Sequence, residues 1–134
     1  MAAQLIAAYY EAFNRADHPA MLALLSDDVV HDVNQGAREV GRERFATFLA
    51  RMDAHYRERI TELVILADPT GQRFAAEFMV EGSYLRADAG FPAARGQRYR
   101  LAAGAFFAVE ARRIHRVTTY YNLQDWLAQV SQAP

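Results

Sequence analysis

The residues best suited to acid–base chemistry lie in the segment Asp27 to Gly36, which reads Asp-Asp-Val-Val-His-Asp-Val-Asn-Gln-Gly. The segment has the pattern of a β-strand, in which successive side chains point to opposite faces. Asp32 and Asn34 then share one face, and His31 lies on the other. A carboxylate in an apolar pocket has a raised pKa and can remove a proton at a useful pH. We predict that Asp32 is a general base and that Asn34 and His31 bind substrate; the alternatives are an Asp32 that caps backbone groups near a turn and a structural His31.

A tyrosine on the first predicted helix is the second catalytic candidate. Tyr9 follows Leu5 and Ile6 at helical spacing, and its hydroxyl can donate a hydrogen bond to an oxyanion that forms during a reaction. The alternative is an aromatic core residue whose hydroxyl reaches the surface. Tyr10 points in a different direction on a helix, so we expect only one of the two tyrosines to line a pocket.

Five further polar residues are candidate substrate-binding residues. Glu77 and Arg100 lie on consecutive predicted strands. Antiparallel pairing would place them opposite each other, either as a pocket acid with an arginine clamp or as a surface salt bridge. Tyr120 and Asn122 share one face at the end of the last predicted strand, where we expect one of them to line the pocket mouth. His55 lies late on the third predicted helix.

The residue types that are missing exclude several kinds of chemistry. The chain has no Cys, and all 15 basic residues are Arg, which excludes disulfides, thiolate nucleophiles, Schiff-base lysines and P-loop lysines. No serine lies in a Gly-x-Ser-x-Gly motif, and the four histidines do not have metal-ligand spacing. We therefore expect neither a metal nor a cofactor.

Charge and hydropathy restrict the partners and the location. The 15 basic and 16 acidic residues give a net charge of −1 without a run of like charge, so we expect no nucleic-acid partner. No basic segment followed by a long apolar run opens the chain, and no apolar stretch approaches the roughly 20 residues that cross a bilayer. We expect a cytoplasmic protein without a membrane partner.

Hydrophobic spacing predicts mainly helices in the first part of the chain and strands in the second. The predicted helices are residues 2–16, a segment capped by Asp17, a segment after Gly41 with apolar residues up to Tyr56, and residues 123–130. One predicted strand ends near Asn34, and the others cover residues 60–67, 73–84, 98–110 and 113–122. We expect a single α+β domain, residues 1–134, in which three N-terminal helices wrap a curved, mainly antiparallel sheet into a cone with an internal pocket.

Four segments carry a family resemblance. Residues 9–17 read Tyr-Tyr-Glu-Ala-Phe-Asn-Arg-Ala-Asp, residues 21–30 Met-Leu-Ala-Leu-Leu-Ser-Asp-Asp-Val-Val, residues 40–45 Val-Gly-Arg-Glu-Arg-Phe, and residues 114–117 Ile-His-Arg-Val. They resemble the opening, the third-helix entry and the last strand of the nuclear transport factor two-like superfamily. Its SnoaL-like, ketosteroid isomerase-related branch is the most similar. The resemblance covers nearly the whole chain, and the superfamily includes both enzymes and non-enzymatic modules.

The resemblance also implies site residues. Ketosteroid isomerase uses an Asp base with an oxyanion hole formed by a Tyr and a protonated Asp. The oxyanion Tyr then corresponds to Tyr9, the base to Asp32 if one residue is skipped and to Val33 otherwise, and the oxyanion Asp to Gly104. The missing carboxyl at Gly104 argues against the full steroid isomerase mechanism. Relatives commonly pair through the open face of the sheet, which implies a homodimer.

The expected function is proton transfer on a small apolar, carbonyl-bearing ligand. The enzyme would be of the isomerase, cyclase or dehydratase type, with Asp32 as base. Two alternatives stay open. One is a non-catalytic ligand-binding or dimerisation module of the same fold. The other is a water-activating enzyme similar to limonene epoxide hydrolase, for which Asp32, Arg100, Tyr9 and Asn34 supply the residue types.

Overall fold

Three helices precede most of the sheet in the computed structural model, which describes residues 2–132. Helix α1 spans Ala2–Asn14, α2 spans His18–Ala23 and α3 spans Arg42–His55. The Asp17 side chain caps α2 by accepting a hydrogen bond from the Ala20 amide at 3.1 Å. Helix α3 follows Gly41, whose φ of +107° is a conformation that glycine adopts without strain.

Six strands form one sheet in the order β2-β1-β6-β5-β4-β3. The strands are β1 (Leu25–Asp32), β2 (Arg38–Val40), β3 (Tyr56–Ala67), β4 (Arg73–Tyr84), β5 (Gln97–Glu110) and β6 (Arg113–Tyr121). Every neighbouring pair is antiparallel except β1 and β6, which are parallel. A last helix, α4 (Leu123–Val130), begins after Asn122, whose side chain caps it.

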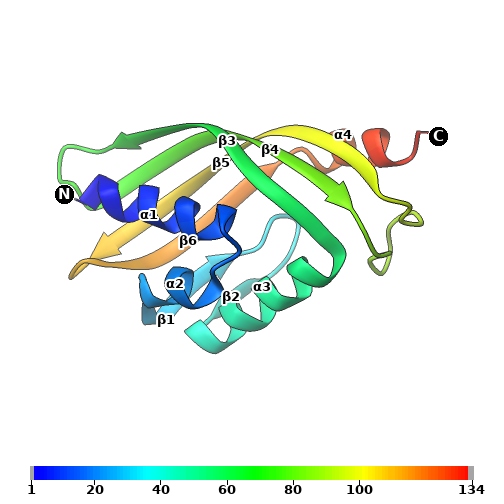
Figure 1. Ribbon diagram of the computed structural model, residues 1–134. Helices are drawn as coiled ribbons and strands as arrows, with labels where there is room; N and C mark the ends of the chain where they lie inside the picture. Colours follow the sequence, from blue (N-terminus) through cyan, green and yellow to red (C-terminus); the bar gives the residue numbers. More distant parts are fainter. Residues whose placement is uncertain (1, 133–134) are drawn as a thin grey trace.

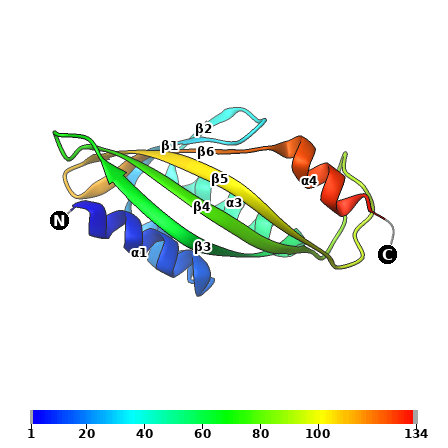
Figure 2. The ribbon, with the colours of Figure 1, turned by 90° about the horizontal axis from the view of Figure 1, so that it is seen from above.

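The helices cover one face of the curved sheet. In Figure 1, α1, α2 and α3 lie beneath the long strands β3 to β6, and α4 follows β6 at one end of the sheet. Seen from above in Figure 2, the short β2 hairpin extends along the opposite edge from β3. This arrangement confirms the predicted α+β class with a mainly antiparallel, curved sheet wrapped by N-terminal helices.

The side-chain alternation along the strands determines which residues face the helices. On β4 these are Phe74, Ala76, Phe78 and Val80, all buried, as their shared face predicted. On β5 they are the odd-numbered residues, including Leu101 and Ala103. A bulge interrupts β3 between Thr61 and Val64, where Glu62 has a φ of +56°. Bulges increase the local bend of a strand and so help the sheet to curve.

Two element boundaries differ from the predictions. The third helix ends at His55, and Tyr56 is the first residue of β3, which begins four residues earlier than the predicted 60. Tyr56 fits the helical spacing of α3, but its pairing with Tyr84 across the sheet overrides that local pattern. The short strand β2 was not predicted, because residues 35–38 have turn chemistry and only three residues of β2 pair with β1.

No helix among residues 2–132 is long and apolar enough to span a membrane.

Candidate active site

The concave face of the sheet and the helices enclose a cavity of about 700 Å³. Helices α1 and α3 form one wall, with Tyr9, Phe45 and Phe48 among the lining residues. Strands β3 to β6 form the other wall, with Phe78, Val80 and Leu101. A mainly apolar cavity of this size with a few polar groups is typical of small-molecule sites.

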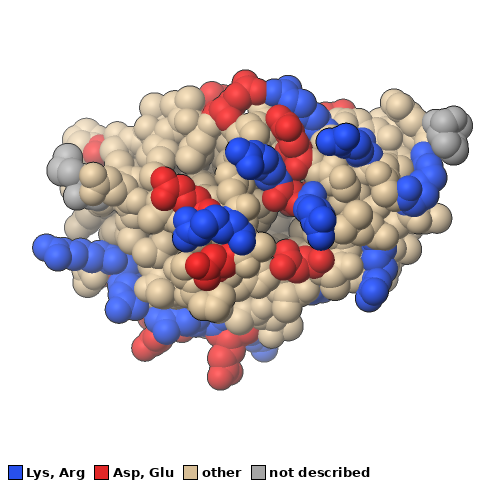
Figure 3. Space-filling view, in the orientation of Figure 1, with Lys and Arg blue, Asp and Glu red and all other residues tan. Residues whose placement is uncertain are grey.

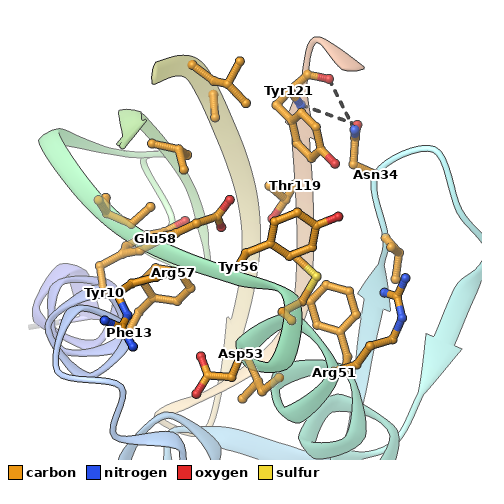
Figure 4. Close-up of a pocket in the computed structure, with 18 of the residues that line it drawn as sticks. Tyr10, Phe13, Asn34, Arg51, Asp53, Tyr56, Arg57, Glu58, Thr119 and Tyr121 are labelled. Atoms are coloured by element: carbon orange, nitrogen blue, oxygen red, sulfur yellow. Dashed lines mark hydrogen bonds between the residues drawn. The ribbon is translucent and has the colours of Figure 1, made fainter. Parts of the chain in front are cut away.

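Glu58 is the carboxylate that faces the interior of this cavity. It lies on β3 between Tyr56 and Ile60, and Figure 4 places it on the same side of the strand as Tyr56, facing the β6 residues Thr119 and Tyr121. The Tyr99 hydroxyl donates a 2.5 Å hydrogen bond to Glu58 Oε2. Burial raises the pKa of Glu58, and the hydrogen bond from Tyr99 opposes that rise. A carboxyl with this environment has the properties of a general base or acid.

Two tyrosines of α1 line the same cavity. Tyr9 and Tyr10 are both buried and both line it, so the expectation that only one of them does is wrong. Their rings meet edge to face, with centroids 5.1 Å apart, and both rings also contact Phe107 on β5. Burial raises the pKa of each hydroxyl well above its ordinary value, so both keep the proton that they can donate.

A second carboxylate, Asp88, also lines the cavity. It belongs to the loop between β4 and β5 and is 5% exposed. Its two oxygens accept hydrogen bonds from Arg51 Nη2 at 2.7 and 2.9 Å, and Oδ2 also accepts one from the Tyr56 hydroxyl at 2.8 Å. The Asp88 amide donates to the Tyr84 hydroxyl, which in turn donates to the Pro92 carbonyl. Because its oxygens are already paired, Asp88 holds the loop in place and is less free than Glu58 to react.

The imidazole of His31 lies between two phenylalanine rings of α3. The ring centroids of Phe45 and Phe48 are each 4.5 Å from that of His31. His31 lines the cavity and is buried, and its Nδ1 has no hydrogen-bond partner among the described residues. Burial lowers its pKa, so the ring is neutral at pH 7. It can therefore offer a neutral hydrogen-bonding group to a ligand.

Charged residues surround the opening of the cavity near the ends of α1 and α3. Arg15, Asp53 and Arg57 belong to its lining, and His18 Nε2 lies 3.3 Å from Asp53 Oδ2. Figure 3 shows basic and acidic side chains around a hollow on this face of the molecule. A ligand would pass from this polar rim to the apolar interior.

The single tryptophan, Trp126 of α4, packs against Tyr99, the hydrogen-bond partner of Glu58. Its ring centroid is 5.1 Å from those of Tyr84 and Phe91 and 6.0 Å from those of Tyr56 and Tyr99. Trp126 also belongs to the cavity lining. These aromatic contacts hold α4 against the sheet.

Sequence and structure comparisons identify the family. The model of the SnoaL-like domain family matches residues 6–117. The chain belongs to this family. Two solved structures, each of a protein named as a putative polyketide cyclase, are similar to this SnoaL-like protein over its whole length. The one from Xanthomonas campestris is 55% identical, covers 97% of this chain and 96% of its own, and has a TM-score of 0.95.

The second structure, from Pseudomonas putida, is 53% identical, covers 98% of each chain and has a TM-score of 0.96. A nuclear transport factor two-like protein of unknown function from Burkholderia pseudomallei is 18% identical, with a TM-score of 0.81 over 96% of each chain. That likeness shows the fold, which agrees with the predicted superfamily. No curated protein matches this SnoaL-like protein at a significant level.

The structure places Asp32 outside the cavity of this SnoaL-like protein. Its carboxylate accepts two hydrogen bonds from Arg38, at 2.6 and 3.1 Å, and one from the Thr118 hydroxyl at 2.7 Å. These contacts lower its pKa to about 2, with the Arg38 hydrogen bond as the largest cause. As predicted, His31 and Asp32 point to opposite faces of β1. The strand face that carries His31 packs against α3 and lines the cavity.

Three of the predicted residues line the cavity: Tyr9, His31 and Asn34. The Asn34 side chain already makes two hydrogen bonds to the backbone of Tyr121. Its amide nitrogen donates to the Tyr121 carbonyl at 3.3 Å, and its oxygen accepts from the Tyr121 amide at 3.4 Å. Val33, the other position for the base, also lines the cavity and carries no acid.

The remaining predicted residues lie elsewhere. His55 Nδ1 contacts the Arg86 carbonyl at 3.1 Å, and Asn122 caps α4. Tyr120 is 57% exposed on the outer face, and neither it nor Asn122 lines the cavity, so the expectation that one of them lines the mouth is wrong; Tyr121 lines the cavity instead.

The predicted pair of Glu77 and Arg100 does not form, because Glu77 lies opposite Gly104 and Arg100 lies opposite Glu81. Arg100 instead pairs with Glu62 and Glu81 at the surface. Gly104 is on the outer face of β5, and the cavity-facing residue beside it is Ala103, so neither position supplies a carboxyl.

Sequence reasoning missed Glu58, Tyr99 and Asp88. A signal for Glu58 existed, because it alternates with Tyr56 and Ile60, two large apolar residues that must face the core. Among residues 2–132, no group of three or more His, Asp or Glu side chains is arranged to hold a metal ion.

Proposed function

We propose that this SnoaL-like protein catalyses proton transfer at a carbon next to the carbonyl group of a small apolar molecule, with Glu58 as the general base. The observation that supports this most is the position of Glu58: a carboxyl of raised pKa that faces an apolar cavity and has only one hydrogen-bond donor among the described side chains. Asp32, the base expected from the sequence, has no access to the cavity in this arrangement.

The reaction needs a base and an oxyanion donor. The Glu58 carboxylate takes a proton from the α-carbon, and the electron pair of that C–H bond moves into an enolate whose oxygen becomes negative. Tyr9 and Tyr10 are the donors available from α1, because their hydroxyls stay protonated in the cavity. Return of the proton from Glu58 to another carbon completes an isomerisation. In an aldol cyclisation the enolate carbon attacks a second carbonyl, and the new alkoxide takes the proton.

The relatives support a reaction of this class. The proteins from Xanthomonas campestris and Pseudomonas putida are named as putative polyketide cyclases, and ring closure of that kind requires an enolate. The cavity offers mainly apolar and aromatic surface together with few polar groups, which suits a carbonyl compound of low polarity.

Deuterium exchange tests the proposal without knowledge of the natural substrate. Apolar cyclic ketones and diketones are incubated with the protein in D₂O, and deuterium at the α-carbon is followed by NMR. We expect exchange above background that falls at least 100-fold in Glu58→Gln, since that variant keeps the size and loses the base. Asp32→Asn is the matched control and keeps the exchange. Equal rates for Glu58→Gln and the wild-type protein would refute the role of Glu58.

The two alternatives give different results. A non-catalytic module binds ketones without exchange in either protein. A water-activating enzyme incorporates ¹⁸O from labelled solvent into an epoxide-derived product.

A homodimer and a cytoplasmic location stay predictions. Exposed apolar residues on the outer face of the sheet agree with a dimer: Phe106 and Tyr120 are 48% and 57% exposed, with ring centroids 6.0 Å apart. We propose that a second copy of the chain covers them. Light scattering should give twice the chain mass for the wild-type protein and the monomer mass for Phe106→Arg; a wild-type monomer would contradict the proposal.

A further inference from the structure

A row of three residues crosses the inner face of the sheet at the candidate base. Gly82 on β4 pairs with Glu58 on β3 and with Tyr99 on β5. Side chains at paired positions on one face are neighbours, so Tyr99 and Glu58 stand on either side of Gly82. Next-nearest strands are about 10 Å apart, and the hydroxyl of Tyr99 reaches Glu58 because its ring lies across the glycine.

The space above Gly82 is filled by that ring. A Cβ atom added to Gly82 would lie 2.5 Å from Tyr99 Cζ and 2.6 Å from its hydroxyl oxygen. Both distances are far below van der Waals contact, so any larger residue at position 82 must displace the ring. Gly82 has no positive φ that would require glycine. The position of the Tyr99 ring therefore explains why residue 82 is a glycine.

We propose that Tyr99 is a positioning residue: its hydrogen bond keeps the Glu58 carboxylate ionised and directed into the cavity. Gly82 is required because it has no side chain, so that the Tyr99 ring can occupy the space above it. This inference rests on the proposed role of Glu58. Tyr99 is buried and does not belong to the cavity lining, so it acts through Glu58 and not on the ligand. Its hydroxyl remains protonated because burial and the neighbouring carboxylate raise its pKa.

No other described side chain is hydrogen-bonded or ion-paired with Glu58. Ionisable groups elsewhere on the cavity wall come from α1, α2, α3, β1, β3, the β4–β5 loop and β6, and they include Tyr10, His31, Arg51, Asp53, Arg57, Asp88 and Tyr121. Removal of the Tyr99 hydroxyl therefore isolates the effect of this one hydrogen bond on Glu58.

The test follows the titration of the Glu58 side chain by ¹³C NMR, with the resonance assigned by its loss in Glu58→Gln. We expect the midpoint to move to higher pH in Tyr99→Phe, because the ionised form loses its donor. We expect the same direction in Gly82→Ala, where Tyr99 remains but is displaced. The exchange rate of a ketone below the wild-type midpoint should fall about tenfold in both variants, as loss of a hydrogen bond to a charged group implies.

A second glycine of the sheet provides the matched control. A Cβ atom at Gly104, on the outer face of β5, would meet only the Ala76 carbonyl oxygen at 3.4 Å, an ordinary contact. Gly104→Ala should leave the Glu58 midpoint unchanged. The inference is overturned if Tyr99→Phe leaves the midpoint in place, or if Gly104→Ala moves it as far as Gly82→Ala does. The midpoint is independent of turnover, so failure of the proposed reaction would appear separately, as absence of exchange in the wild-type protein.

Discussion

His31 and Asp32 are adjacent in β1 and have opposite electrostatic environments. The His31 ring is packed between Phe45 and Phe48 and is neutral at pH 7, whereas the Asp32 carboxylate is paired with Arg38 on the other face of the strand. One residue therefore contributes to the cavity and its neighbour to the connection between β1, β2 and β6. Their substitution should change the stability of the protein in different pH ranges, mild acid for His31 and strong acid for Asp32.

The ion pair of Asp32 should stabilise the fold in a pH-dependent manner. Its folded pKa of about 2 lies below the ordinary value of 3.8, so its contribution is present above pH 4 and is lost as the pH falls through 2. Asp32→Asn should lower the free energy of unfolding by about 1 kcal/mol at pH 7, a value reduced for the exposure of Arg38. Urea titrations at pH 7 and pH 2.5 measure it, and a difference of equal size at both pH values would contradict the assignment.

His31 should make the protein less stable in mild acid. Burial lowers its folded pKa, so the unfolded chain binds a proton first, and stability decreases as the pH falls below about 6.5. His31→Phe removes both this proton uptake and the unpartnered Nδ1. We expect a flatter dependence of Tm on pH between 5 and 7 than in the wild-type protein. His115→Phe, at a partly exposed position, is the control. A wild-type slope in His31→Phe would contradict the prediction.

Asp88 should be important for stability rather than for chemistry. Asp88→Ala leaves Arg51 and the Tyr56 hydroxyl without their acceptor and frees the loop that carries Phe91. We expect a loss of roughly 2–3 kcal/mol in the free energy of unfolding, because a buried carboxylate that accepts hydrogen bonds from both groups is removed. Asp53→Ala, at an exposed pair with His18, should cost less than about 0.5 kcal/mol. Chemical denaturation of both variants makes the comparison; equal losses would refute it.

The pH profile of the proposed reaction should have a single limb on the acid side. Burial raises the pKa of Glu58, so kcat/KM should increase through a pH above the ordinary glutamate value of 4.5. The rate should then stay constant to pH 9, because Tyr9 and Tyr10 keep their protons far above pH 10. Measurement of exchange between pH 4 and pH 9 decides this. A midpoint below 4.5 would indicate a base in contact with solvent.

Much of the fold could be predicted from the chain, because apolar and polar residues alternate along the long strands. The predicted strand 73–84 and helix 123–130 coincide with β4 and α4. The start of β3 could not be predicted, since Tyr56 satisfies the helical spacing of α3 and only the pairing with Tyr84 decides its conformation. Strand β2 depends on the same kind of long-range information.

The site was harder to predict than the fold, for a physical reason. Alternation separates Asp32 from His31, but it does not say which face of β1 packs against α3; that depends on Phe45 and Phe48, which follow later in the chain. The hydrogen bond between Glu58 and Tyr99 joins residues 41 positions apart and passes over a third strand. No local pattern contains that contact, although the alternation of Tyr56, Glu58 and Ile60 indicates the inward direction of Glu58.

The position of Trp126 gives the protein an intrinsic optical reporter. It is the only tryptophan, it lines the cavity, and it contacts the ring of Tyr99 behind the candidate base. Selective excitation of this indole therefore records events at one end of the cavity, without background from other indoles. Compounds can be screened by quenching or wavelength change of its emission, so the search for the natural ligand can start before any turnover assay exists.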